Sequence, residues 1–135
     1  MKSFKKIMSL PVLLLMALGF AACGKNESTK VANTYEQITQ ERAAEMMKVD
    51  DGHLIVDVRR YDEYEAGHIP GAICVPNESI ATEQPAELPD KDQILLVYCR
   101  SGRRSKEAAK KLADMGYTKV YEFGGVITWS GELVK

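Results

Sequence analysis

The chain has 135 residues, of which 45% are hydrophobic and 27% charged, and 18 basic side chains nearly balance 19 acidic ones. This length suits one folded domain, and the composition excludes a long disordered chain and a collagen-like one. The near-neutral balance argues against a general nucleic-acid-binding surface, which needs an excess of basic residues on one face. Three cysteines are too few for a disulfide-stabilised scaffold, so each is interpreted separately.

Residues 1–22 have the layout of a secretory signal peptide. Three lysines precede an apolar run over residues 7–20, and two alanines lead to Cys23. The run is shorter than a transmembrane helix of about 20 residues, and Pro11 interrupts it. The sequence Phe20-Ala-Ala-Cys23-Gly resembles a bacterial lipobox, whose cysteine is acylated and becomes the mature N-terminus. We therefore expect an extracytoplasmic protein anchored to a membrane of the cell envelope by a lipid on Cys23; the alternative is a plain signal peptide with an incidental cysteine.

The next segment, residues 23–33, is polar and predicts a flexible tether, and residues 34–135 are expected to form the folded domain. Short apolar segments rich in β-branched residues predict its strands. They are residues 54–58, 72–75, 94–98 and 119–123, and residues 35–38 are expected to add a short first strand. The continuous apolar character of these segments indicates strands that are covered on both faces.

Helix-like segments alternate with these strands. They are residues 40–49, 61–66 and 104–115. Thr39 is a suitable N-cap for the first helix, and Gly116 is a suitable end for the third. The alternation predicts an α/β fold: a single domain with a central parallel β-sheet flanked by helices on both faces.

The most apolar strand ends directly in a cysteine, which is followed by a basic turn and a helix. Residues 99–105 read Cys-Arg-Ser-Gly-Arg-Arg-Ser. Such a turn directs backbone N–H groups and the positive end of the helix dipole toward its centre. This field favours a Cys99 thiolate, and Gly102 permits the positive φ that a tight loop requires. The combination predicts an anion-binding site around a nucleophilic Cys99, whereas the cysteine alone would be interpreted as a small core residue.

Four segments together resemble the rhodanese-like sulfurtransferases. They are Asp57-Val-Arg59, residues 63–72 (Glu-Tyr-Glu-Ala-Gly-His-Ile-Pro-Gly-Ala), the loop 99–105, and Gly124-Gly-Val-Ile-Thr-Trp129. Their order and spacing agree with the family over nearly the whole folded part. The resemblance implies that Cys99 attacks the outer sulfur of an anionic donor such as thiosulfate and that sulfite leaves. A thiol or cyanide then takes the sulfur from the Cys99 persulfide, by ping-pong kinetics.

The resemblance also implies which loop residues bind the substrate. They are Arg100, Ser101, Gly102, Arg103 and Arg104. Their backbone amides would hold the transferred sulfur and its negative charge, and the three arginines would attract the donor and help sulfite depart. Neither a metal nor a cofactor is expected, and the expected state is a monomer that does not bind nucleic acid.

Three residues near the site are expected to have structural roles. Asp57 and Arg59 end a strand beside the loop, where they would orient the loop or pair with Glu63. His68 is expected to form a buried hydrogen bond within the fold rather than to take part in the chemistry.

Cys74 lies in a predicted strand and is expected to be a core residue. A disulfide between Cys74 and Cys99 would abolish activity, and the sequence leaves this pairing open because it does not give the separation of the two residues.

The sequence leaves two alternatives to a sulfurtransferase. One is a non-catalytic rhodanese-like binding module, because the family contains inactive members. The other is a cysteine phosphatase or arsenate reductase. A phosphatase loop needs arginine after five intervening residues, where this chain has Ser105, and Arg104 comes one residue early. The shorter ring therefore favours sulfur transfer.

Overall fold

The apolar segments of the chain form the strands of one sheet in the computed structural model, which describes residues 33–135. The strands are β1 (Glu36–Gln37), β2 (Leu54–Asp57), β3 (Ile73–Cys74), β4 (Leu95–Cys99) and β5 (Val120–Gly125). All neighbouring strands pair in parallel, in the order β1-β5-β4-β2-β3. The predicted parallel sheet is therefore confirmed. The predicted signal peptide, Cys23 and the predicted tether up to residue 32 lie outside the described residues.

Three α-helices occupy the predicted positions. They are α1 (Gln40–Met47), α2 (Tyr61–Ala66) and α3 (Arg103–Asp114). The Thr39 hydroxyl accepts a hydrogen bond from the Arg42 amide at 3.1 Å, so the predicted N-cap is confirmed. Gly116 follows α3 at a φ of +102°, as expected for a glycine that ends a helix. Two short 3₁₀ turns, η1 (Asn77–Ser79) and η2 (Val126–Thr128), carry no sequence signal that predicted them.

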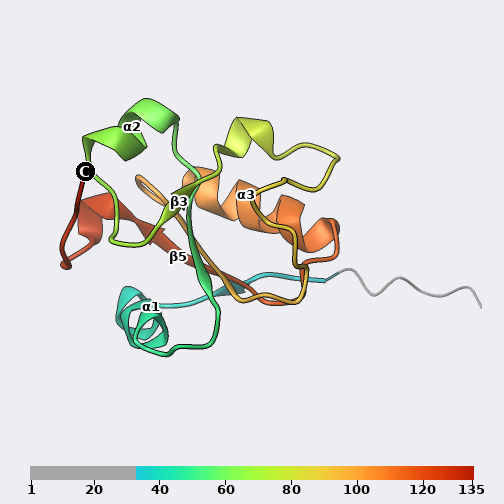
Figure 1. Cartoon of the computed structure of the whole chain (residues 1–135), viewed down its shortest axis with the longest axis horizontal. Coiled ribbons are helices and arrows are strands. Elements are labelled where there is room, and N and C mark those ends of the chain that lie inside the picture. Colours follow the sequence, from blue (N-terminus) through green and yellow to red (C-terminus); the bar gives the residue numbers. More distant parts are fainter. Residues whose placement is uncertain (1–32) are drawn as a thin grey trace, which may run out of the picture.

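Each face of the sheet has its own hydrophobic core, and the residues of β4 alternate between the two cores. Leu95, Val97 and Cys99 face α3, whereas Leu96 and Tyr98 face α1. Figure 1 shows α1 and α3 on opposite sides of β5. Every residue of β4 is buried, which is why its sequence is continuously apolar. Helices on both faces, as the sequence predicted, are confirmed.

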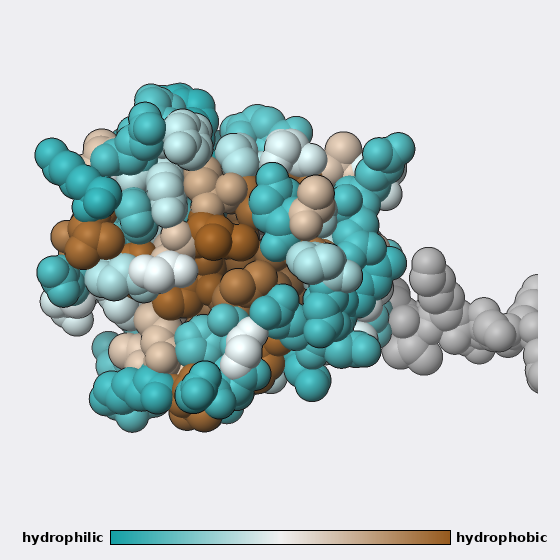
Figure 2. Space-filling view, in the orientation of Figure 1, coloured by the Kyte–Doolittle hydropathy of each residue, from teal (hydrophilic) through white to brown (hydrophobic). Residues whose placement is uncertain are grey.

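A groove of about 710 Å³ lies on the face that carries α1, and its lining includes Met47, Ile55 and Ile69. Figure 2 shows apolar side chains gathered in the middle of the surface in this view. Cys99 faces the opposite side of the sheet, so this groove is separate from the predicted site. Within residues 33–135, no helix is long and apolar enough to span a bilayer.

A buried ion pair fixes the carboxyl end of β2. The Asp57 side chain is fully buried, and Arg59 Nη2 and Nε donate to its carboxylate at 2.7 to 3.1 Å. Arg59 Nη2 also donates to the Gly67 carbonyl at 2.7 Å, so the pair ties β2 to the segment that leads into β3. Burial alone would lower the pKa of Arg59, but the hydrogen bonds and charge of Asp57 outweigh it and raise that pKa. The expected pairing of these two residues with Glu63 is wrong, because they pair with each other.

Replacing Asp57 with Ala should destabilise the fold by about 3–5 kcal/mol, because Arg59 would keep a buried charge without its partner. The control is Asp62→Ala, which removes an exposed ion pair with Arg60 at 3.1 Å and should leave the free energy of unfolding almost unchanged. Urea denaturation of both variants measures the free energy of unfolding. Equal losses for the two variants would contradict the structural role of the buried pair.

Candidate active site

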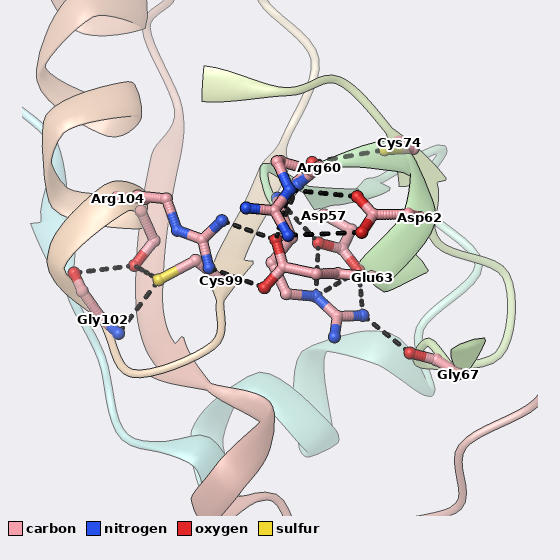
Figure 3. Close-up of polar contacts among 11 residues, drawn as sticks. Asp57, Arg60, Asp62, Glu63, Gly67, Cys74, Cys99, Gly102 and Arg104 are labelled. Carbon is pink, nitrogen blue, oxygen red and sulfur yellow. Dashed lines mark hydrogen bonds and ion pairs between the residues drawn. The ribbon is translucent and has the colours of Figure 1, made fainter. Parts of the chain in front are cut away.

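Cys99 lies at the carboxyl end of β4, at the base of the turn that leads into α3. Its exposed fraction is 1%, and its Sγ accepts a hydrogen bond from the Gly102 amide at 3.0 Å (Figure 3). Of the loop amides expected to surround the sulfur, Gly102 is the one whose N–H reaches Sγ. The sulfur is therefore buried beside polar groups and is not enclosed by hydrocarbon alone.

The start of α3 gives the loop its electrostatic character. Gly102 is the N-cap residue and adopts a φ of +105°, as its position in the sequence suggested. The first amides of a helix have no intrahelical acceptor, so those of Arg103, Arg104 and Ser105 remain available for a negatively charged atom. The positive end of the helix dipole adds to this field at Cys99. The local geometry therefore suits an anion next to Sγ.

The two glycines at the end of β5 support the loop from below. A Cβ on Gly125 would collide with the carbonyl group of Arg100, so only glycine allows the two backbones to approach this closely. The Arg100 carbonyl also accepts a hydrogen bond from the Ile127 amide at 3.2 Å. Gly124 has a φ of +93°, which favours glycine as well. The Gly-Gly pair thus sets the height of the loop above the sheet.

The three arginines of the loop have different surroundings. Arg104 Nη1 and Nη2 donate to the two oxygens of Glu63 at 2.7 and 3.0 Å, and the two side chains point toward one another (Figure 3). This bond holds the pKa of Glu63 at about 2, although burial acts in the opposite direction. Arg103 is largely exposed and pairs with Glu107 at 3.1 Å. Arg100 is exposed and forms no salt bridge within residues 33–135.

Two polar residues near Cys99, Ser105 and Glu122, contact each other in a way that the sequence did not predict. The Cys99 thiol is 3.4 Å from the Ser105 hydroxyl, which lies 2.6 Å from Glu122 Oε1. The sequence places Ser105 at the end of the loop without indicating a role for it, and it does not give the register of the strand that carries Glu122. The parallel register places Glu122 beside Val97 and therefore on the same face as Cys99, which only the folded structure reveals.

His68 lies away from Cys99 and interacts with its own segment. Its Nδ1 is 2.9 Å from the Tyr64 carbonyl oxygen, and its ring stacks on the Tyr64 ring at a centroid distance of 3.7 Å. The residue is half-buried, and its backbone pairs with Val134. These contacts agree with a structural interpretation of His68. No group of three or more potential metal ligands was found within residues 33–135.

Cys74 is too far from Cys99 for a disulfide. The two residues lie on β3 and β4, which β2 separates, so their Cα atoms are about 10 Å apart, whereas a disulfide needs less than about 7 Å. Cys74 shares a register row with Asp57 and Tyr98 and therefore faces the opposite side of the sheet. It is half-buried, not a core residue as expected, and burial raises the pKa of its thiol to about 11.

Comparisons with known proteins agree with this geometry. The family model of the rhodanese-like domain matches residues 39–132. YrkF of Bacillus subtilis is 32% identical over 114 residues, which make up 84% of this chain and 60% of that protein. Thiosulfate sulfurtransferase GlpE of Coxiella burnetii is 36% identical over 96 residues, 70% of this chain and 87% of that protein. A solved structure of rhodanese with anions from E. coli is 35% identical with a TM-score of 0.56, covering 62% of this chain and 98% of that one.

Replacing Glu63 with Gln should make the loss of stability depend on pH. The pKa of Glu63 lies below its ordinary value of 4.5, so its ion pair with Arg104 stabilises the fold fully above about pH 4.5 and loses this effect as the pH falls toward 2. The variant should be less stable than the wild type by about 1–2 kcal/mol at pH 7. Denaturation at several pH values should show this difference vanishing near pH 2. A difference that stays constant with pH would contradict the pairing. The control is Glu65→Gln on the exposed face of α2, which should show no such dependence on pH.

Proposed function

The chain belongs to the family of rhodanese-like domains, and from this premise we propose that it is a sulfurtransferase that carries sulfane sulfur on Cys99. The observation that carries the proposal is the position of Sγ, 3.0 Å from the Gly102 amide at the positive end of α3. Similarity to a relative named thiosulfate sulfurtransferase supports the same class of reaction. We propose thiosulfate, or a donor of the same charge, as the source of the sulfur.

In the first half-reaction, the Cys99 thiolate forms a bond to the outer sulfur of thiosulfate. The sulfur–sulfur bond of the donor breaks, and sulfite leaves with the bonding electron pair. The product is a persulfide anion on Cys99, whose outer sulfur carries the negative charge. The free amides of Arg103 and Arg104 at the start of α3 would stabilise this charge, in the way that an oxyanion hole stabilises oxygen.

In the second half-reaction, a nucleophile such as cyanide or a thiolate attacks the outer sulfur. The bond between the two sulfurs breaks, the acceptor leaves with the outer sulfur, and Cys99 returns as a thiolate. The two half-reactions share no ternary complex, so the proposal implies ping-pong kinetics.

The arginines would contribute through different routes. Arg100 is exposed and forms no salt bridge within residues 33–135, so its charge is available to attract a dianionic donor. The bidentate bond to Glu63 fixes the Arg104 guanidinium, so Arg104 would supply a positioned charge near the loop. The exposed fraction of Cys99 is only 1%, so the loop above it would have to admit the donor's sulfur.

Treating the purified protein with thiosulfate should add one sulfur atom to Cys99. Mass spectrometry of the tryptic peptide 92–100 would detect the added sulfur, which cyanide should remove with formation of thiocyanate. Cys99→Ser should abolish both the adduct and the sulfurtransferase activity.

Cys74→Ser is the matched control, because this thiol lies on the opposite face of the sheet and should leave the adduct on Cys99 unchanged. If reduced and desalted protein acquires no sulfur on Cys99, the sulfurtransferase proposal fails. That result would favour a non-catalytic binding module instead.

The proposal extends to a location at the bacterial cell envelope. The lipobox-like sequence that ends at Cys23 supports an acylated N-terminus, and the polar residues that follow would separate the domain from the membrane surface. An envelope-anchored domain would then meet donors and acceptors outside the cytoplasm.

Growth of a bacterial host with a labelled palmitate analogue tests the anchor. The wild-type chain should incorporate the label, and Cys23→Ala should not, because the acylated thiol is missing. Cys74→Ser should incorporate the label like the wild type. Equal labelling of Cys23→Ala and wild type, or no labelling of either, would rule out acylation at Cys23.

A further inference from the structure

Glu122 is a buried carboxylate on β5 that the proposed reaction does not use. Its exposed fraction is 3%, and it forms no salt bridge within residues 33–135. Its Oε1 accepts hydrogen bonds from the Ser105 hydroxyl at 2.6 Å and from the Gly124 amide at 2.8 Å. A carboxylate within hydrogen-bond reach of a hydroxyl is a group that can accept its proton.

The Ser105 hydroxyl has one proton and three acceptors within reach. These are Glu122 Oε1 at 2.6 Å, the Gly102 carbonyl at 3.0 Å and the Gly124 carbonyl at 3.4 Å. The carboxylate is the nearest and the only charged acceptor, so the hydroxyl proton points to Glu122. The lone pairs of the Ser105 oxygen are then free to accept from the Cys99 thiol, which lies 3.4 Å away.

The fold brings these three groups together from three different elements. Cys99 ends β4, Ser105 belongs to the first turn of α3, and Glu122 lies on β5. Cys99 and Glu122 both face α3, and Ser105 is fully buried between them. The result is a continuous line of hydrogen bonds from the thiol to the carboxylate.

We propose that Glu122 accepts the proton of the Cys99 thiol through the hydroxyl of Ser105; the role in sulfur transfer rests on the proposed function. The Sγ–H bond breaks as that proton binds the Ser105 oxygen. At the same time the original hydroxyl proton moves to Glu122 Oε1. The total charge of the three groups stays the same, and the thiolate accepts hydrogen bonds from Ser105 and from the Gly102 amide. Glu122 is thus a positioning residue that acts through Ser105.

The charged groups around this line are compatible with the transfer. Arg104 on α3 lies on the Cys99 side, where its positive charge favours the thiolate, and Glu63 offsets part of that charge. Lys106 and Glu122 both line a shallow cleft of about 320 Å³ beside β1, which Gln40 and Thr128 also line. Glu122 can exchange its proton with solvent through this cleft, which Ser101 and Gly102 of the loop also line.

The test is the pH dependence of Cys99 alkylation by iodoacetamide in the full-length chain, followed on the tryptic peptide 92–100. Glu122→Gln keeps the shape of the side chain and an acceptor for Ser105 but cannot hold the proton. This variant should alkylate roughly tenfold more slowly at pH 6.5, and the midpoint of its profile should move to higher pH. Each profile is scaled to its own rate at high pH, so a change in access to Cys99 does not move the midpoint.

Ser105→Ala interrupts the same line and should shift the profile in the same direction, and the double variant should show no further shift. This second variant also keeps the test valid if Glu122→Gln does not fold, which circular dichroism would detect. Glu36→Gln removes one exposed carboxylate from β1, the strand next to β5, and should leave the profile unchanged.

Two outcomes would overturn the proposal. One is a scaled Glu122→Gln profile that superimposes on that of the wild type. The other is a shift to lower pH, which is the effect of merely removing a negative charge next to a thiol. Alkylation needs no sulfur donor, so this result is independent of whether thiosulfate modifies Cys99. If the wild type forms no persulfide but the alkylation profile still shifts, the proposed function fails and the proton transfer stands.

Discussion

The site depends on the close backbone contact between the loop after β4 and the end of β5. The carbonyl group of Arg100 occupies the space that a side chain on Gly125 would need. This contact holds the loop low over the sheet, so that the chain turns back at Gly102 and the Gly102 amide points to Cys99 Sγ. A larger residue at Gly125 would lift the loop and move the amides away from the sulfur. The absence of one side chain on β5 therefore sets the geometry around Cys99 at the end of β4.

Charge around this loop is arranged at two levels. The field at Sγ comes from peptide groups at the start of α3, which are fixed by the fold and need no ionised neighbour. The side-chain charges lie further out: Glu63 fixes Arg104, while Arg100 remains exposed. Peptide dipoles can thus stabilise a sulfur anion directly, whereas in the proposed reaction the side-chain charges would attract an anionic donor. Glu122 is the exception among the side-chain charges, because its carboxylate is buried close to Cys99.

Much of the fold followed from local sequence patterns. The apolar segments and the capping residues gave the helices and strands to within about two residues, because each pattern reflects burial of its own element. The position of Cys99 between a strand and a helix was likewise predictable from neighbouring residues in the sequence. The partner of Glu63 was not, since Arg104 lies 41 positions further along the chain on another helix. Pairing with Glu63 was one of the two roles expected of Arg59, but Arg59 pairs with Asp57, two positions before it, and Glu63 binds Arg104 instead.

The sequence by itself determined the position of the candidate nucleophile Cys99, the loop that follows it and the parallel α/β architecture, because these are encoded in contiguous residues whose spacing matches the periods of strands and helices. Only the tertiary structure decided the distance from Cys99 to the other cysteine, the support of the loop by Gly125, and the line from Cys99 through Ser105 to Glu122. These contacts join β4, α3 and β5, and strand order and register are set by packing the whole sheet between two layers of helices. Ser105 and Glu122 are 17 positions apart in the chain and come into contact only when that packing is complete.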